Sequence, residues 1–310
     1  MGALGEGPFH VSEAMAAGVT RRQLEARRFR RLFRGVYVRS ELAMTFQLWL
    51  RAALKVAPAG AVVSHHSAAR LWGLQLRGER RLHLSTTTPT TTVLAGTVMH
   101  RRQAAIASRV VDGLPVTSPE RTLVDCAGPR HRISLVWLVA LAEHLIHTNR
   151  CTLDGLTAYC WRRHLHGVRR ARRVMGLARE GAESAMETVV RLMIVFARLP
   201  EPACNPTVYA DDGRRLGRVD LVYGRFKIAI EYDGRWHERS ALQRTIDRDK
   251  RERLEADGWI VIVVYDSDLR HPRTVVLRVH DALCRRGYTG PAPVFSDVWT
   301  RWFSARTATF

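Results

Sequence analysis

The run at residues 259–265, WIVIVVY, constrains the fold more than any other feature of this chain, because both of its faces are apolar. A strand with two apolar faces is stable only inside a sheet that is covered on both sides. Periodicity and turn signals predict the elements around it. These are helices at 184–199, 241–257 and from 268 through 283, and strands at 207–210, 216–223 and 226–233. We therefore predict a mixed sheet flanked by helices, in the order αβββαβα.

Three acids interrupt these strands: Asp220 in RVDLVY, and Glu231 and Asp233 in IAIEYDG. Alternation along a strand puts Lys227, Glu231 and Asp233 on one face, and a turn at 224–225 brings Asp220 near the same end. Crowded carboxylates repel each other unless a cation is present, and an all-oxygen cluster suits Mg²⁺ or Mn²⁺. The alternative is that each acid ends a strand at the surface and pairs with an arginine.

The chain is strongly basic, with 49 Lys+Arg against 29 Asp+Glu and a formal net charge of +20. Only Lys55, Lys227 and Lys250 are lysines. A GC-rich genome would explain arginine in place of lysine, but it would not explain the excess of positive charge. A polyanionic partner explains that excess, because each phosphate that is neutralised releases counterions.

Cysteine usage and hydropathy indicate the cellular compartment in which the protein is expected. The five cysteines are odd in number and form no CxxC pair, which fits a reducing cytosol better than a disulfide framework. The N-terminus lacks a signal-peptide pattern, and the most apolar stretch, 135–146, is too short to span a bilayer. We expect a cytoplasmic protein without a membrane partner.

The first 40 residues have the pattern of a helix-turn-helix with a wing. Thr20 and Gln23 have the spacing of a capping box, and 29–38 is typical of two short strands that turn near Arg34. A helix-turn-helix places the start of its second helix in the major groove, and the wing contacts phosphates. The expected DNA-binding residues are Arg21, Arg22 and Gln23 on that helix and Arg30, Arg31 and Arg34 on the wing. The alternative is an arginine-rich face exposed only to solvent.

The segments RVDLVY, IAIEYDGRWH and DRDKRERLEADGWIVIVV resemble a domain of unknown function related to the very-short-patch mismatch-repair endonucleases, in the PD-(D/E)XK restriction-endonuclease-like superfamily. The resemblance covers about residues 183–283. It implies that Asp220 and Glu231 bind a metal ion and that Asp233 and His237 reach the site. Glu187 matches an accessory acidic position of the superfamily, but it also has the spacing of a capping box with Ser184.

One position departs from the superfamily pattern, in which a lysine usually follows the second acid by two residues. That position is Asp233 here, and Lys227 lies about 13 Å from Glu231 along the strand, too far to replace it. His237 is therefore the expected general acid or base, as in the mismatch-repair relatives, unless it is structural. On the next helix, Arg244 and Arg248 share a face and either contact phosphate or are solvated.

The segment VSEAMAAGVTRRQLEARRFRRLFRGVYV resembles the winged-helix N-terminal domain of abortive-infection type IV antitoxin proteins. Two further segments, SHHSAARLWGL at 64–74 and TSPERTLVD at 117–125, resemble the domain that follows it in that family. We predict four regions: a winged helix-turn-helix at 1–40, an antitoxin-like α+β domain with a basic linker at 41–173, an endonuclease-like domain at 181–287, and an irregular tail at 288–310.

Two hypotheses follow from the sequence. The first is a DNA-binding endonuclease that depends on Mg²⁺ or Mn²⁺, with Asp220, Glu231 and Asp233 at the metal, His237 as acid or base and Glu187 assisting. The second is a non-catalytic DNA-binding regulator of the antitoxin type, in which the nuclease fold is only a scaffold. RNA stays open as an alternative to DNA, because charge does not distinguish the two polymers. We also expect a homodimer.

Overall fold

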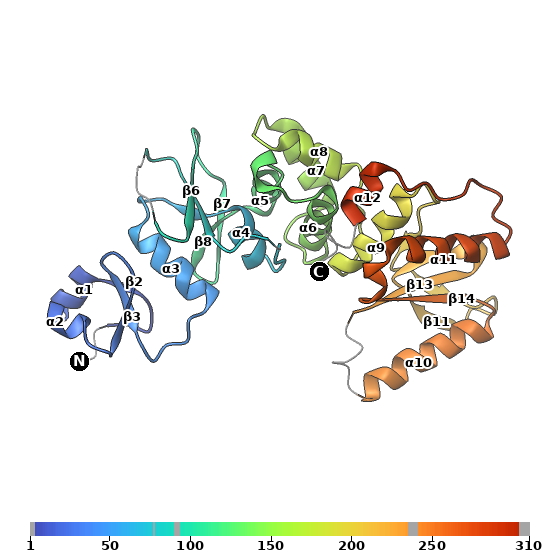
Figure 1. The fold of residues 1–310 in the computed structure, drawn as a ribbon, viewed down its shortest axis with the longest axis horizontal. Helices are drawn as coiled ribbons and strands as arrows, with labels where there is room; N and C mark the ends of the chain where they lie inside the picture. The colour runs from blue at the N-terminus through green and yellow to red at the C-terminus, as the bar shows by residue number, and fades with distance from the viewer. Residues whose placement is uncertain (1–3, 77, 90–93, 235–240, 304–310) are drawn as a thin grey trace. The chain divides into compact units, whose positions relative to one another are not determined.

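The computed structural model describes residues 4–76, 78–89, 94–234 and 241–303, with the side chains of 241–244 left out. The chain divides into two compact units, residues 1–128 and 129–310 (Figure 1). Each unit combines helices with β-sheet, as the α+β prediction requires. Among the described residues, no helix combines the length and apolar character that crossing a membrane requires.

The first 40 residues fold into two short helices against a three-stranded antiparallel sheet of order β1-β3-β2. Phe9, Ala14 and Leu24 form its core. The capping box is confirmed, because Gln23 N donates to Thr20 Oγ1 at 3.3 Å and Thr20 N donates to Gln23 Oε1 at 2.7 Å. The predicted pair of strands at 29–38 is confirmed as well. The elements are β1 (Phe9–His10), α1 (Val11–Ala16), α2 (Arg21–Leu24), β2 (Phe29–Phe33) and β3 (Val36–Arg39).

The rest of the first unit is built on a five-stranded mixed sheet of order β6-β5-β4-β8-β7. The helix α3 (Phe46–Val56) precedes the sheet in the chain. The helix α4 packs against β5 and β8, and α5 packs against α4. In the threonine-rich stretch that follows β5, residues 90–93 lie outside the described residues. The elements are β4 (Val62–Val63), α4 (His65–Leu71), β5 (Leu82–Thr86), β6 (Thr97–Arg101), β7 (Ser108–Val111), β8 (Leu114–Thr117) and α5 (Pro119–Cys126).

The second unit begins with a group of helices that a buried ion pair fastens together. Arg191 on α9 donates to the carboxylate of Glu143 on α6 at 2.5 Å, and both side chains are 1% exposed. The basic run predicted as a helical linker is divided between the end of α7 and α8. The elements are η1 (Pro129–His131), α6 (Leu135–His147), α7 (Leu153–Arg162), α8 (Val168–Met175) and α9 (Ala185–Phe196).

A four-stranded sheet of order β14-β13-β12-β9 forms the centre of the second unit. β13 and β14 are parallel and the other pairs are antiparallel, so the predicted mixed sheet is confirmed. Figure 1 shows α10 and α11 on opposite sides of this sheet, which is the cover that the apolar strand β14 requires. The elements are β9 (Ala203–Cys204), β12 (Leu221–Tyr223), η2 (Gly224–Phe226), β13 (Ile228–Asp233), α10 (Ala241–Ala256), β14 (Ile260–Tyr265), η3 (Asp268–Arg270) and α11 (Pro272–Arg285).

The prediction of one continuous strand at 216–223 is wrong. The segment forms β11 (Arg215–Arg218), which pairs with β10 (Thr207–Tyr209) in a separate hairpin, and then β12, which pairs with β13 and β9. The break falls at Val219 and Asp220. There the side chain of Asp220, rather than a backbone carbonyl, accepts the hydrogen bond from Tyr232 N at 2.8 Å.

Two smaller predictions also fail. Lys227 does not share the strand face with Glu231, because it lies before β13 in a left-handed conformation (φ 46°) at the end of η2. The tail predicted to be irregular contains α12 (Asp297–Phe303), which buries Trp299 and Phe303. Trp299 Nε1 donates to the carbonyl of Met193 on α9 at 2.8 Å, so packing on α9 stabilises this short helix.

Candidate functional sites

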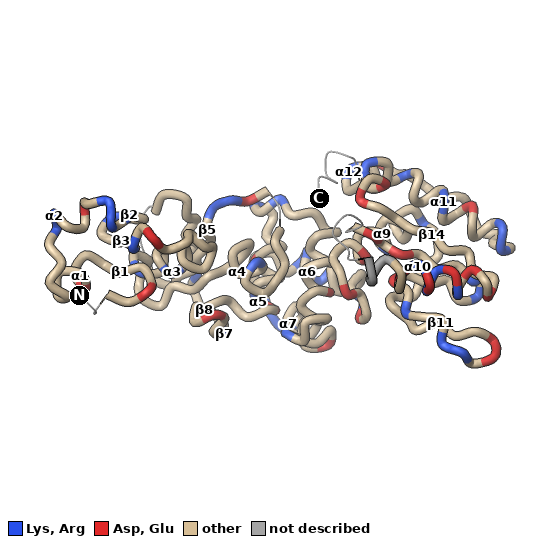
Figure 2. Tube along the Cα trace, turned by 90° about the horizontal axis from the view of Figure 1, so that it is seen from below, with Lys and Arg blue, Asp and Glu red and all other residues tan. Residues whose placement is uncertain are grey.

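The first candidate site is an exposed group of arginines on the N-terminal fold, which we call the arginine surface. Leu24 is buried in the core, and this orients α2 so that the residues before it face solvent. Figure 2 shows basic residues at α2 and β2. Within the described part of the chain, no arginine of this surface forms an ion pair with a carboxylate. The surface consists of Arg21, Arg22, Arg30, Arg31 and Arg34, all exposed.

Gln23 lies beside these arginines and is exposed, but its carbonyl oxygen is already engaged. Oε1 accepts hydrogen bonds from Thr20 N at 2.7 Å and from Thr20 Oγ1 at 3.0 Å. The capping box therefore fixes the side chain and leaves only its amide NH₂ to donate to a base. If Gln23 contacts a base, as the sequence predicts, its side chain can therefore only donate a hydrogen bond to that base.

The second candidate site is the carboxylate cluster, which we define as Glu187, Asp220 and Glu231 together with Lys250. Leu221 on β12 is paired with Ile230 on β13, so the same register brings Asp220 opposite Glu231. Burial, followed by the charges of Glu187 and Glu231, raises the pKa of Asp220 to about 7, although Tyr232 N and Lys250 oppose the shift. A carboxylate in this position is charged at neutral pH only at a cost in free energy.

Lys250 on α10 completes this cluster. Its ammonium group contacts Glu231 Oε1, and the two side chains are 21% and 14% exposed. Nζ also donates to the carbonyl of Arg218 at 3.1 Å. Gly217 makes room for the lysine, because a Cβ at that position would lie 2.8 Å from Lys250 Cγ and 2.9 Å from Cδ.

Lys250 is the residue that sequence reasoning missed. The superfamily that the sequence resembles usually has a lysine two residues after the second acid, whereas the lysine that contacts Glu231 in this chain lies on a helix, 19 positions further along the sequence. One signal was available: only three lysines occur among 49 basic residues, so each lysine marks a position where arginine was not used.

The acids around Asp220 are held in different ways. Glu187 Oε2 accepts hydrogen bonds from Glu183 N at 2.9 Å and from Asn205 Nδ2 at 2.5 Å, so its first role is to order the chain before α9. Only half of the predicted capping box forms, because Ser184 Oγ accepts from Glu187 N at 3.2 Å whereas the Glu187 carboxylate accepts from Glu183 N and not from Ser184 N. The charge of Glu187 still acts on Asp220. Asp233 ends β13 and is 5% exposed, on the same face as Glu231.

The remaining predicted residues receive less support from the structure. His237 lies outside the described residues, as does the side chain of Arg244, so their roles stay predictions. Arg248 is exposed on α10 and lies 3.7 Å from Asp249 Oδ1 and 3.6 Å from Glu252 Oε1. A phosphate would have to compete with these two carboxylates for Arg248.

A cluster of buried histidines in the first unit is a further group of titratable side chains. His83 Nδ1 lies 2.9 Å from His100 Nε2, and His65 Nε2 lies 2.9 Å from Arg102 Nη2. Burial and the neighbouring His83 lower the pKa of His66 to about 4, so this imidazole is neutral at physiological pH. Within the first unit these contacts link the imidazoles to one another and to Arg102.

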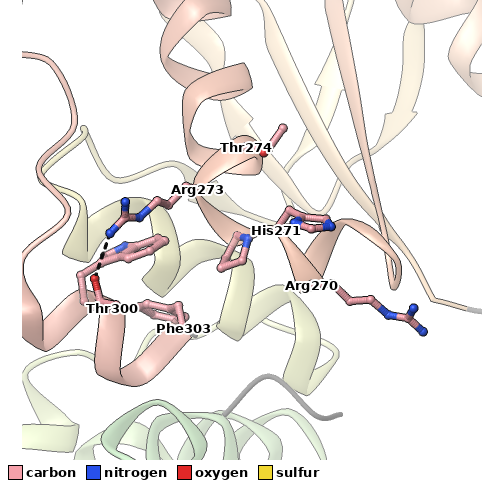
Figure 3. Close-up of a pocket in the computed structure, with 8 residues that line it drawn as sticks. Arg270, His271, Arg273, Thr274, Thr300 and Phe303 are labelled. Atoms are coloured by element: carbon pink, nitrogen blue, oxygen red, sulfur yellow. Dashed lines mark hydrogen bonds between the residues drawn. The ribbon is translucent and has the colours of Figure 1, made fainter. Parts of the chain in front are cut away.

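A cavity of about 300 Å³ lies between the start of α11 and α12 (Figure 3). Arg273 Nη2 donates to Thr300 Oγ1 at 3.3 Å across it. Its remaining walls come from Arg270, His271, Pro272, Thr274, Trp299 and Phe303. The residues of the carboxylate cluster do not line this cavity.

Comparison with known proteins identifies the class to which the middle of the chain is similar. Residues 59–177 match the family model of the AbiEi antitoxin C-terminal domain. This confirms the antitoxin-like part of the resemblance that the sequence suggested, and it lends no support to catalysis.

Two proteins of Mycobacterium tuberculosis, one from each of two strains and both described as uncharacterized, are also similar. Each is 28% identical to this chain over 264 residues, which is 84% of this chain and 94% of the relative. The similarity therefore extends over nearly the whole length of those proteins.

Proposed function

We propose that this chain is a DNA-binding regulatory protein of the antitoxin kind and that residues 1–40 are a winged helix-turn-helix that contacts duplex DNA. The match of residues 59–177 to the AbiEi antitoxin C-terminal domain supports the class. The observation that carries the DNA partner is the arginine surface, where five exposed guanidinium groups lie on one small packed fold. The comparisons thus favour the regulator over the nuclease, the reverse of the order in which the sequence ranked them.

Each part of the surface has a distinct role in this proposal. Arg21 and Arg22 begin α2, where a recognition helix meets base edges in the major groove. Arg30 and Arg31 on β2 neutralise phosphates, which positions the protein without specifying a sequence. Removing Arg21 and Arg22 should therefore reduce the preference for one DNA sequence, whereas removing Arg30 and Arg31 should reduce the affinity for every duplex.

The test is selection of preferred duplexes from a random library, followed by affinity measurements on the selected and a scrambled sequence. Replacing Arg21 and Arg22 by alanine should reduce the preference for the selected sequence about tenfold or more. Replacing Arg30 and Arg31 should weaken both duplexes alike. Arg81→Ala is the matched control, because Glu79 already binds that exposed guanidinium at 2.7 Å. Wild-type binding by both double variants would contradict the proposal.

The carboxylate cluster favours a second candidate function, metal-dependent hydrolysis of a phosphodiester. The donor types suit a hard divalent cation, because Asp220, directly before β12, and Glu231 on β13 both offer carboxylate oxygens and burial disfavours the charge of Asp220. Asp220, Glu231 and Asp233 would have to move closer together to hold Mg²⁺ or Mn²⁺, because no three carboxylates of the described residues have oxygens within 4.8 Å of one another. A bound ion would polarise a phosphoryl oxygen and lower the pKa of bound water. Lys250 would place a fixed positive charge beside the phosphate.

Lys250 also supports the opposite conclusion, because its ammonium group already neutralises Glu231 without a metal ion. Plasmid cleavage in Mg²⁺ or Mn²⁺ separates the two functions. A nuclease should lose activity at least about a hundredfold in Asp220→Ala and in Lys250→Ala. Lys227→Ala is the matched control, since Lys227 pairs with Asp257 at 3.3 Å and lies outside the cluster. No cleavage by the wild type, or cleavage that survives Asp220→Ala, would exclude the nuclease.

A further inference from the structure

The helical hairpin α7–α8 carries a concentration of positive charge that the functions above do not use. The segment 161–173 contains six arginines and two histidines, and the nearest acids along the chain are Asp154 and Glu180. Among the residues that the structure describes, Arg162, Arg163, Arg169 and Arg173 are exposed and form no ion pair. Such a surface attracts polyanions.

These arginines lie on a packed scaffold rather than on a linker. Val168, Ala171, Val174 and Met175 form the buried face of α8, so Arg169 and Arg173 point to solvent. α8 packs against both α6 and α7. The backbone positions that carry the positive groups are therefore fixed relative to one another before any ligand binds, which lowers the entropic cost of binding.

Arg172 ties α8 to the end of α7 and positions an aromatic ring. Its Nε donates to the carbonyl of Cys160 at 3.1 Å, and its Nη2 donates to that of Arg163 at 3.3 Å. The guanidinium lies 4.8 Å from the centroid of the Trp161 ring. A cation over one face of an indole holds the ring in place.

Trp161 is nevertheless 61% exposed, which is unusual for so large an apolar side chain. The last residue of α7, Arg162, and the residues that follow it, Arg163 and His164, are exposed beside it. An exposed ring held by one arginine and surrounded by others is the arrangement on which nucleobases stack while arginines bind the phosphates.

We propose that α7–α8 is a second nucleic-acid surface and that its ligand is a single strand, on which Trp161 stacks a base and Arg169 and Arg173 bind phosphates. A duplex fits less well, because its bases already stack on each other and offer no face to the indole. The surface belongs to the second unit and shares no residue with the arginine surface, so the proposal does not depend on duplex binding by residues 1–40.

The test measures binding of the full chain to fluorescein-labelled dT₁₂ and U₁₂ and to a 12-base-pair duplex, by anisotropy. Trp161→Ala should weaken single-strand binding about tenfold and leave duplex binding unchanged. Trp161→Phe should retain most of the affinity, which excludes misfolding as the cause. Tyr209→Ala is the matched control, because Tyr209 is a comparably exposed aromatic residue at 56%. Preference for dT₁₂ or U₁₂ identifies the polymer, and either one supports the proposal.

Replacing Arg169 and Arg173 together should reduce the salt dependence of single-strand binding by about 1.4 in the log–log slope. Three results would overturn the proposal. They are absence of single-strand binding by the wild type, equal loss in Trp161→Ala and Tyr209→Ala, or a loss in Trp161→Ala that is as large for the duplex as for dT₁₂ and U₁₂. If the surface binds only an acidic protein, the wild type will show no single-strand binding.

Discussion

The N-terminal fold and the core of the second unit use charge in opposite ways. On the arginine surface, guanidinium groups such as those of Arg30 and Arg31 are exposed and contribute little to packing. In the second unit, Arg191 is 1% exposed and held by Glu143 and Glu201, and Asp220 is crowded by other acids. The difference teaches where to look for function: exposed charges can be removed without loss of the fold, whereas buried charges are bound up with stability.

The largest effect is expected at the buried ion pair. Arg191→Ala would leave the carboxylate of Glu143 buried without its cation, so the free energy of unfolding should fall by about 3–5 kcal/mol. Urea unfolding of the full chain measures the loss. Arg31→Ala serves as the control and should change stability by less than about 0.5 kcal/mol. Comparable losses of unfolding free energy in Arg191→Ala and Arg31→Ala would contradict the conclusion that only the buried charges support the fold.

The carboxylate cluster predicts a pH dependence with a definite sign. The pKa of Asp220 is raised to about 7 in the folded state, so the folded chain binds more protons than the unfolded chain between about pH 4 and 7. The contribution of this group to stability is therefore present at low pH and is lost as the pH rises through 7.

Asp220→Asn should consequently raise stability at pH 8 by on the order of 2 kcal/mol relative to the wild type, and by much less at pH 4. The measurement is the difference in melting temperature between the two proteins across pH. Mg²⁺ should narrow that difference at pH 8 if the cluster binds the metal. A variant that is less stable than the wild type at pH 8 would show that Asp220 is satisfied by other groups.

The arginine surface should respond in binding rather than in stability. Arg30 and Arg31 are consecutive on β2 and point to opposite faces of the sheet, so replacing both by alanine removes about one phosphate contact and the slope of log affinity against log salt should fall by about 1. Titration of the duplex at several salt concentrations measures it. The melting temperature should stay unchanged, and a drop in that temperature would mean that these arginines also support the fold.

The smallest effect is expected at the helix cap of the N-terminal fold. Thr20→Ala removes the hydroxyl that accepts from Gln23 N, at a cost of about 1 kcal/mol. It also frees the carbonyl of Gln23 from one of its two hydrogen bonds. Thermal unfolding of the wild type and Thr20→Ala, with Thr20→Ser as the conservative control, tests whether local caps hold this small region together.

Local patterns along the chain were sufficient to predict most elements of the sheet in the second unit. The sequence predicted that Asp220 and Glu231 lie near the same end of the strands, but not their register, because the connection is longer than the predicted turn at 224–225: η2 and Lys227 fill it, and Tyr223 pairs with Ile228. The division at Val219 could not be foreseen, because it depends on a hydrogen bond between a side chain and the amide of Tyr232. Hydrophobic periodicity shows which face of a strand is apolar. It does not show where a side-chain carboxylate accepts a hydrogen bond in place of a backbone carbonyl.

Contacts between segments that are distant in the sequence could not be predicted, for the same reason. Lys250 looked like one more charged residue of α10, since nothing in its own helix indicates which strand lies beneath it. The helix α12 was missed because it is short and follows several turn-forming residues, and only its packing on α9 stabilises it. Both features arise from tertiary structure.

Gly217 and Lys250 are coupled in space, because the stem of the lysine occupies the volume that a side chain at 217 would need. The backbone at Gly217 also has a φ of 157°, which favours glycine whether or not the lysine is present. The dependence therefore runs in one direction: a side chain at 217 would displace the ammonium group from Glu231, whereas loss of the lysine would not release position 217. A residue other than glycine at this position in a related protein would indicate that the lysine no longer reaches Glu231.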